Sequence, residues 1–330
     1  REICDCDVRD EIMLKSFDRV NGDYNDFWAG RDYLHDLGPV RAATLMAHAF
    51  NDWNVMPEHS VRIALALKKQ GVPVQMYFHQ GGHGGAPPFA VMNKWFTRYL
   101  YGVNNDIEEE PRAWIVREGG SRRKPTAYED YPHPQASPVT VRPVAETGSL
   151  ARKADGKQGR ASFTDDVEFS GAELAQKELP HRLLYRTAPL EVPLHLSGTA
   201  RLELRLAVDR PAANLSVWLV SLPWTESRRI TDNIVTRGWA DPQNHGSLTE
   251  SEPLEPGEYY DLAFDLQPDD QIIPKGQQLA LMIFSSDRDF TLWPNAGTEL
   301  TIDLDATRLT LPVVGGEAAF DAAVQKTRDL

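Results

Sequence analysis

The sequence predicts an α/β unit followed by an all-β sandwich, and two observations carry this prediction. Between residues 40 and 102, short apolar runs alternate with amphipathic helical patterns, which is typical of parallel β/α units. From about residue 200 onward, apolar residues recur at every second position in several segments, which is typical of antiparallel strands in a sandwich. The stretch 102–111 is polar and rich in turn-forming residues. We therefore place a boundary there, with the α/β unit at 1–105 and the β sandwich at 106–330.

The α/β unit is predicted as strand, helix, strand, helix. Residues 42–50, AATLMAHAF, form an apolar run of strand length between a Gly-Pro pair and an Asn-Asp pair. Residues 57–71 predict an amphipathic helix that begins at a proline and ends at a glycine. A second buried strand is expected at 72–78, and apolar residues at helical spacing predict a helix over 88–102. Residues 1–38 look helical and irregular, and we expect them to cap the sheet.

The sandwich is predicted from alternation and turn signals. The segments expected to be strands are 200–208, 214–222, 259–266, 277–286 and 299–305. No helical pattern appears in this part until the last dozen residues. The stretch 119–190 is rich in Pro, Gly, Ser and Lys, and we assign no element there.

Composition bounds the classes of function. The chain has 330 residues, of which 41% are hydrophobic and 25% charged, and its formal net charge is −13. This acidity argues against a nucleic-acid partner, and no apolar run is long enough to span a membrane. Cys4 and Cys6 lie too close in sequence to bridge each other easily, so a pair of free thiols is favoured, while a bridge to another segment leaves the redox compartment undecided. The opening has neither an initiator Met nor signal-peptide features, so we expect a fragment or a processed chain.

Polar, ionisable side chains follow both predicted strands of the α/β unit. Asp52 comes just after the first strand, in AHAFNDWNV, and His83 lies in the glycine-rich loop of FHQGGHGG after the second. Loops at the carboxyl ends of neighbouring parallel strands leave the same sheet edge, and such strands lie about 5 Å apart, so the carboxylate and the imidazole can meet. A carboxylate that orients an imidazole forms the acid–base half of a Ser-His-Asp triad, and the order acid, then histidine, is that of α/β-hydrolases. We therefore predict that Asp52 and His83 are catalytic.

Simpler interpretations compete with this prediction. An Asp after Asn in a loop is often a turn or capping residue. His79 is the rival for the catalytic histidine, and His79 with His83 could also form an H-x-x-x-H metal pair, although that spacing does not align two imidazoles outside a helix. His48, at the end of the first strand, is expected to be structural.

No nucleophile is evident in the sequence. No serine lies in a G-x-S-x-G block, and the serines near glycine, Ser121, Ser149, Ser170, Ser197 and Ser247, all follow His83. The two thiols near the start are weak candidates. We expect the nucleophilic serine to lie N-terminal to residue 1.

Three blocks of the chain resemble a known family. LMAHAFNDWNVMPEHS, MYFHQGGHGG and the β-rich RGWADPQN…LEPGEYYDLAFDLQPDDQIIPKGQQLALMIFSSD are similar to the Xaa-Pro dipeptidyl-peptidases and related serine hydrolases, including cocaine-esterase-like enzymes. The resemblance covers nearly the whole chain. It implies the C-terminal part of an α/β-hydrolase domain followed by a jelly-roll domain usually described as non-catalytic. It also implies that Asp52 is the triad acid and His83 the triad base, while the family's G-x-S-Y-x-G serine has no counterpart here.

The resemblance implies a serine exopeptidase that releases Xaa-Pro dipeptides without a metal or an organic cofactor. Its partners would be a peptide with proline at the second position and the N-terminal segment that carries the serine, and a homodimer is left open. The alternatives are an esterase or amino-ester hydrolase of the same fold, and a non-catalytic β-sandwich binding or assembly module. A carbohydrate-binding face at Trp218, Trp239 and Trp293 is less favoured than packing of these rings. The compartment is not readable from the residues; the resemblance implies the cytoplasm, with secretion as the alternative.

Overall fold

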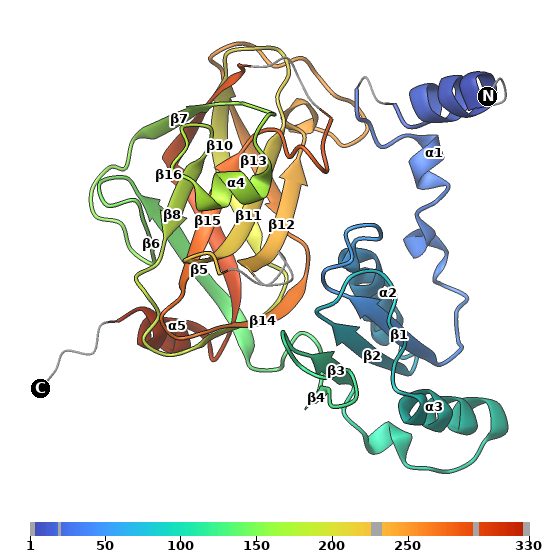
Figure 1. Cartoon of the computed structure of the whole chain (residues 1–330). Helices are drawn as coiled ribbons and strands as arrows, with labels where there is room; N and C mark the ends of the chain where they lie inside the picture. The colour runs from blue at the N-terminus through green and yellow to red at the C-terminus, as the bar shows by residue number, and fades with distance from the viewer. Residues whose placement is uncertain (1–3, 19–20, 226–232, 293–296, 326–330) are drawn as a thin grey trace, which may run out of the picture.

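In the computed structural model, the chain forms a small mixed sheet with helices and a larger, mainly antiparallel β sandwich (Figure 1). The structure describes residues 4–18, 21–225, 233–292 and 297–325. Figure 1 shows the two parts side by side, with the N-terminal segment running from the upper end of the sandwich down to the small sheet. None of the described helices is both long and apolar enough to cross a membrane.

The small sheet has the strand order β1-β2-β3-β4. Its strands are β1 (Thr44–Ala49), β2 (Val74–His79), β3 (Ala113–Val116) and β4 (Thr126–Tyr128). The first three strands are parallel, and β4 runs antiparallel to β3. Helix α2 (Pro57–Lys69) connects β1 to β2, and α3 (Phe89–Tyr101) follows β2. The two strands and two helices predicted for this unit are thus confirmed, with ends shifted by one or two residues.

Local chemistry sets the ends of these helices. Pro57 occupies the first turn of α2, where its missing N–H leaves no hydrogen bond unmade. Gly102 ends α3 in a left-handed conformation with φ of 70°, which a glycine adopts without steric cost. All six residues of β2 are buried, as expected of a strand with neighbours on both edges.

Two layers of strands make up the sandwich, and β5 pairs with strands of both. The strands are β5 (Ala136–Val144), β6 (Ser149–Ala151), β7 (Arg160–Thr164), β8 (Leu183–Arg186), β9 (Leu194–Gly198), β10 (Arg201–Val208), β11 (Leu215–Leu222), β12 (Ile234–Ala240), β13 (Tyr259–Asp265), β14 (Asp269–Ile273), β15 (Gln278–Phe284) and β16 (Glu299–Val314). Their inward-facing apolar residues form one continuous core. This architecture confirms the predicted combination of an α/β unit and a jelly-roll β sandwich.

The structure adds elements that the sequence analysis left unassigned. Strands β4 to β8 lie in the stretch 119–190, as does helix α4 (Gly171–Gln176). Helix α5 (Gly316–Val324) begins three residues before the last dozen, where the sequence shows a helical pattern. Strand β16 runs for 16 residues, well beyond the predicted 299–305. The division after residue 105 stays a prediction, and β3 and β4 beyond it pair into the same sheet as β1.

The N-terminal segment consists of short helical pieces. They are a π-helical stretch over Cys4–Ser16, helix α1 (Asp26–Ala29) and a one-turn helix over Tyr33–Asp36. Tyr24 N–H donates to the carbonyl of Leu248, and Asn244 donates to the carboxylate of Asp23, so this segment contacts the sandwich. Its expected role as a cap stays a prediction.

Candidate active site

The loops after β1 and β2 leave the same edge of the small sheet. The two strands are parallel neighbours, and Ala49 at the end of β1 lies opposite His79 at the end of β2. Asp52 follows the first of these positions by three residues, and His83 follows the second by four. Equivalent strand ends therefore place both loops at the carboxyl edge, where open α/β sheets carry their functional groups.

Asp52 and His83 are hydrogen-bonded to each other. His83 Nδ1 lies 2.8 Å from Asp52 Oδ2, a normal distance for such a bond. Only 3% of the Asp52 residue is exposed, whereas the side chain of His83 is 65% exposed. Within the described part of the chain, the bond to Asp52 is the only hydrogen bond of the His83 side chain. We refer to these two residues as the acid–base pair.

The Asp52 carboxylate is held in place by its own loop. Its second oxygen, Oδ1, accepts hydrogen bonds from the backbone N–H groups of Asn54 and Val55, both at 3.1 Å. Burial opposes ionisation of Asp52, but the bonds from Val55, His83 and Asn54 outweigh it, and the pKa of this carboxyl lies below its usual value. Asp52 is therefore a fixed anion at neutral pH, which is the state that can orient and stabilise an imidazolium.

His79, the rival histidine, is buried inside the loop that carries His83. Its Nδ1 accepts a hydrogen bond from Gly81 N–H at 3.0 Å. Burial, with Arg122 nearby, lowers the pKa of His79 and keeps its ring neutral. A Cβ added at Gly81 or Gly85 would meet this ring and the Arg122 guanidinium, so these glycines let the loop close around His79. In the described part of the chain, no group of three or more His, Cys, Asp or Glu side chains is arranged to hold a metal ion.

His48 lies on the other side of Asp52. Its Nε2 lies 3.4 Å from Asp52 Oδ2 and 3.0 Å from the carbonyl oxygen of Val55. Its Nδ1 is hydrogen-bonded to the hydroxyl of Ser60 on α2. Because both ring nitrogens are hydrogen-bonded to protein groups, His48 connects the 51–55 loop to helix α2.

Asn51 and Gln80 were not singled out in the sequence, although each is buried next to the acid–base pair. Asn51 Nδ2 donates to Gln80 Oε1 at 3.0 Å and to the Gln80 carbonyl at 3.1 Å. Gln80 Nε2 in turn donates to Asp269 Oδ1 and to the carbonyl of Asp270, both at 2.8 Å. The only sequence signal was their position, since each is the first polar residue after its strand, β1 for Asn51 and β2 for Gln80.

Trp53 connects the same loop to the sandwich in a second place. The guanidinium carbon of Arg237, on β12, lies 4.1 Å from the Trp53 ring centre, 4.3 Å from that of Trp218 and 4.8 Å from that of Phe290. This geometry is that of a buried cation–π cluster. The loop that carries Asp52 therefore contacts the β sandwich through an aromatic ring.

The tryptophans considered for a carbohydrate face are packed against protein where the structure describes them. Trp218 is buried, and its indole N–H donates to Asp287 Oδ2 at 2.9 Å. Trp239 donates to the same oxygen at 3.1 Å and packs against Phe290. Trp293 and the side chains of Cys4 and Cys6 lie outside the described residues.

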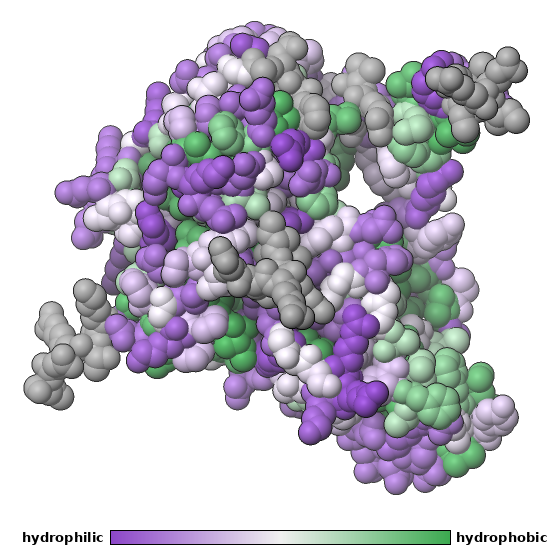
Figure 2. Space-filling model, in the orientation of Figure 1, coloured by the Kyte–Doolittle hydropathy of each residue, from purple (hydrophilic) through white to green (hydrophobic). Residues whose placement is uncertain are grey.

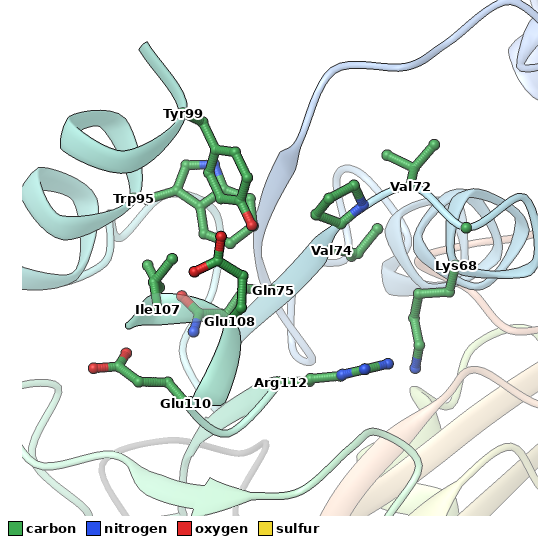
Figure 3. A pocket seen from close by; sticks show the side chains of 12 residues that line it. Lys68, Val72, Val74, Gln75, Trp95, Tyr99, Ile107, Glu108, Glu110 and Arg112 are labelled. Carbon is green, nitrogen blue, oxygen red and sulfur yellow. The ribbon is translucent and has the colours of Figure 1, made fainter. Parts of the chain in front are cut away.

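Two cavities lie near these elements, and neither is lined by Asp52 or His83. A cavity of about 320 Å³ is lined by Val72 to Gln75, Trp95 and Arg112 (Figure 3), which places it at the amino ends of β2 and β3, away from Asp52. A second cavity of about 580 Å³ lies between the N-terminal segment and the sandwich and is lined in part by Trp28 and Trp239. Trp239 is the lining residue that contacts the Asp52 loop, since its ring centre lies 6.3 Å from that of Trp53.

Comparison with protein families gives two matches of one group, which together cover most of the chain. The family described as the X-Pro dipeptidyl-peptidase C-terminal non-catalytic domain matches residues 105–325, and the X-Pro dipeptidyl-peptidase (S15) family matches residues 2–85. A putative Xaa-Pro dipeptidyl-peptidase of Rhodopirellula baltica is 59% identical over 98% of this chain and 52% of its own length. One of Bacillus anthracis is 34% identical over 95% of this chain and 52% of its own. The chain thus spans about half the length of these relatives.

Solved structures share the fold. An aminopeptidase from a marine sediment archaeon (Thaumarchaeota archaeon) superimposes with a TM-score of 0.72 at 15% identity, over 92% of this chain and 60% of that one. An α-amino acid ester hydrolase superimposes with a TM-score of 0.68 at 14% identity, over 91% and 61%. A CocE/NonD family hydrolase from Staphylococcus aureus gives 0.68 at 16%, over 89% and 58%. At these identities the likeness is one of fold alone.

Proposed function

The chain belongs to the X-Pro dipeptidyl-peptidase family, and from this premise we propose that it supplies the acid and the base of a serine peptidase. The reaction is release of an Xaa-Pro dipeptide from the N-terminus of a peptide. The single observation that carries the proposal is the 2.8 Å hydrogen bond between His83 Nδ1 and the buried Asp52 carboxylate. It leaves Nε2 of an exposed imidazole for proton transfer to and from a nucleophile.

The pair has a defined part in each step of acyl transfer. A serine hydroxyl attacks the carbonyl carbon of the substrate's proline, and His83 Nε2 takes the proton of that hydroxyl. When the tetrahedral intermediate collapses, the peptide C–N bond breaks and His83 returns the proton to the leaving amine. Water then attacks the acyl-enzyme with His83 Nε2 again as the base. The ester C–O bond breaks, His83 returns the proton to the serine oxygen, and the dipeptide leaves. Asp52 stabilises each imidazolium that forms, and no metal or organic cofactor is required.

We place the nucleophile on an N-terminal segment that docks against β1. This strand lies at the end of the small sheet and pairs with β2 alone among the described strands. Parallel sheets are normally covered on both faces, yet most of β1 is only half-buried. Helix α3 also exposes Phe89, Phe96 and Leu100, and Figure 2 shows apolar surface over this helix. The relatives' additional length supports a segment that covers this edge.

An esterase or amino-ester hydrolase would use the same pair. An α-amino acid ester hydrolase shares the fold of this chain, so the fold is compatible with this alternative. The two activities differ in their leaving group. An amine leaving group requires protonation by His83, whereas an alkoxide or phenolate leaves with less help. Comparing an Ala-Pro anilide with an Ala-Pro ester therefore separates a peptidase from an esterase.

The test is hydrolysis of Ala-Pro-p-nitroanilide by the full-length protein and its variants. We expect His83→Ala and Asp52→Ala to lower kcat by about 10⁴ each, with a small change in KM, because substrate binding does not need the pair. His59→Ala, which changes an exposed histidine on α2, is the matched control and should keep wild-type activity. Full activity in His83→Ala would refute the assignment. If a fluorophosphonate probe labels no serine, the chain is a non-catalytic module.

A further inference from the structure

Two aspartates of the β sandwich lie directly behind the loops of the acid–base pair. Asp269 and Asp270 begin β14, and both are buried. Asp270 Oδ1 accepts from Arg117 Nη1 at 2.7 Å, from Tyr128 OH at 3.0 Å and from His195 Nε2 at 3.1 Å. The Asp270 carboxylate is thus bound by groups outside the two loops of the acid–base pair. Asp269 instead faces the catalytic loops.

Asp269 is connected to both loops through a single side chain. Its Oδ1 accepts from Gln80 Nε2 at 2.8 Å, and the Gln80 amide oxygen accepts from Asn51 Nδ2 at 3.0 Å. Gln80 lies three residues before His83, and Asn51 directly precedes Asp52. The sequence separation between Gln80 and Asp269 is 189 residues, so this contact exists only because the sandwich packs on the α/β unit.

Every polar atom of the Gln80 amide is used in this bridge. Nε2 donates one hydrogen to Asp269 and the other to the carbonyl of Asp270, while Oε1 accepts from Asn51. A buried amide with all partners present has one preferred orientation, because any rotation leaves a polar group unpaired. The bridge therefore fixes the first residues of both loops relative to each other and to β14.

We propose that Asp269 is a positioning residue for the acid–base pair, acting through Gln80 and Asn51. The inference rests on the function proposed above and deepens it. Asp269 lies in the part of the chain that matches a family described as non-catalytic. The proposal assigns this part a role in the geometry of the catalytic loops. Loss of a positioning group of this kind typically lowers activity by about 10- to 100-fold, since small displacements of reacting groups slow the chemical step.

The test compares two substitutions of nearly equal size in the full-length protein. Asp269→Asn keeps an oxygen that accepts from Gln80, whereas Asp269→Leu removes it. Burial raises the pKa of Asp269 to about 7, so Asn mimics the protonated acid. With Ala-Pro-p-nitroanilide at pH 6, we expect kcat to fall about 10- to 100-fold in Asp269→Leu with KM little changed, and to be largely retained in Asp269→Asn.

The control is Asp165, another buried aspartate of the sandwich, which accepts from Ser286 N–H and hydroxyl and does not contact the catalytic loops. Asp165→Leu should reduce stability without the selective fall in kcat. Equal kcat losses in Asp165→Leu and Asp269→Leu, or wild-type kcat in Asp269→Leu, would overturn the proposal.

A spectroscopic measurement separates this inference from the proposed function. In histidine-labelled full-length protein, the NMR signal of the His83 Nδ1 proton shared with Asp52 should shift or broaden in Asp269→Leu and persist in Asp269→Asn. An unchanged signal in Asp269→Leu would refute positioning whether or not the protein is a peptidase. A wild-type protein that hydrolyses no Ala-Pro substrate, with the signal changed as expected, would instead refute only the proposed function.

Discussion

The ring of His79 fills the interior of the 80–85 loop, while that of His83 lies at its surface. Both histidines lie close to the end of β2, but only His83 reaches the Asp52 carboxylate. His79 accepts a hydrogen bond from Gly81 and is surrounded by loop backbone and Arg122. Burial of one ring thus supports the loop that exposes the other.

Two adjacent glycines of this loop allow a matched test of that arrangement. Gly84 and Gly85 both have positive φ, 87° and 106°, so alanine strains the backbone at either position. A Cβ at Gly84 meets nothing within 4 Å, whereas one at Gly85 meets the His79 ring and the Arg122 guanidinium. We expect Gly84→Ala to destabilise the α/β unit by about 1 kcal/mol and Gly85→Ala by about 3 kcal/mol. Hydrogen exchange of the β2 amides measures both; equal losses would show that His79 does not constrain the loop.

At the scale of elements, the 51–55 loop and strand β12 are held together by a buried cation. Burial lowers the pKa of Arg237 to about 10, partly offset by Asp287, so the guanidinium stays charged at neutral pH. It contacts three aromatic rings, of which Trp53 alone belongs to the loop. Desolvated cation–π contacts are worth about 2 kcal/mol, more than exposed ones.

A double-mutant cycle measures this connection. For Trp53→Ala and Arg237→Met we expect a coupling free energy of about 1–2 kcal/mol in urea unfolding, because each single variant already removes the shared contact. The control cycle pairs Trp53→Ala with Arg201→Met, an exposed arginine of β10 that is bonded to Asp265. That cycle should show no coupling. A coupling below about 0.3 kcal/mol for Arg237 would mean that Trp53 docks by shape alone.

The elements of the α/β unit could be predicted because their hydrophobic periods are clear and their ends carry proline and glycine signals. Helix α4 was missed although Ser170 and Glu173 form a capping box, since six residues are too few to show a helical period. Strand β16 was underestimated because its alternation changes phase after Leu304. The buried positions are 300, 302 and 304 before this point and 307, 309 and 311 after it, where the register with β10 shifts.

The residues of the candidate site also differ in whether the sequence could predict them. Asp52 and His83 could be proposed because strand-end position and chain order are local properties of the sequence. Gln80 and Asp269 could not be paired, because their contact joins residues far apart in the chain and depends on how the two parts pack. No spacing rule in a single sequence reports such a contact.

At the scale of the whole molecule, titratable groups with shifted pKa values have opposite effects on the free energy of unfolding below neutral pH. Burial raises the pKa of Asp269 to about 7, so the folded chain binds a proton there that the unfolded chain, with a carboxyl pKa of about 3.9, releases. The stability contributed by this group is fully present below about pH 4 and is lost as pH rises through about 7. His79 and His133, whose pKa values are lowered chiefly by burial, act the other way, since the unfolded chain takes up protons there below about pH 6.5.

The effects of Asp269 and of the two histidines overlap in pH, so the unfolding free energy of the wild type alone does not separate them. The difference in unfolding free energy between the wild type and Asp269→Asn isolates the effect of Asp269. Asparagine does not titrate, while both histidines contribute equally to the two proteins. Between pH 4 and pH 7 the wild type should lose up to about 4 kcal/mol of unfolding free energy relative to Asp269→Asn, the equivalent of about three pKa units. Urea unfolding at half-unit pH steps measures the difference, with Asp165→Asn as the control. Parallel curves for wild type and Asp269→Asn would mean that Asp269 ionises as an ordinary carboxyl with a pKa of about 3.9, and that the bridge to Gln80 is negatively charged above about pH 5.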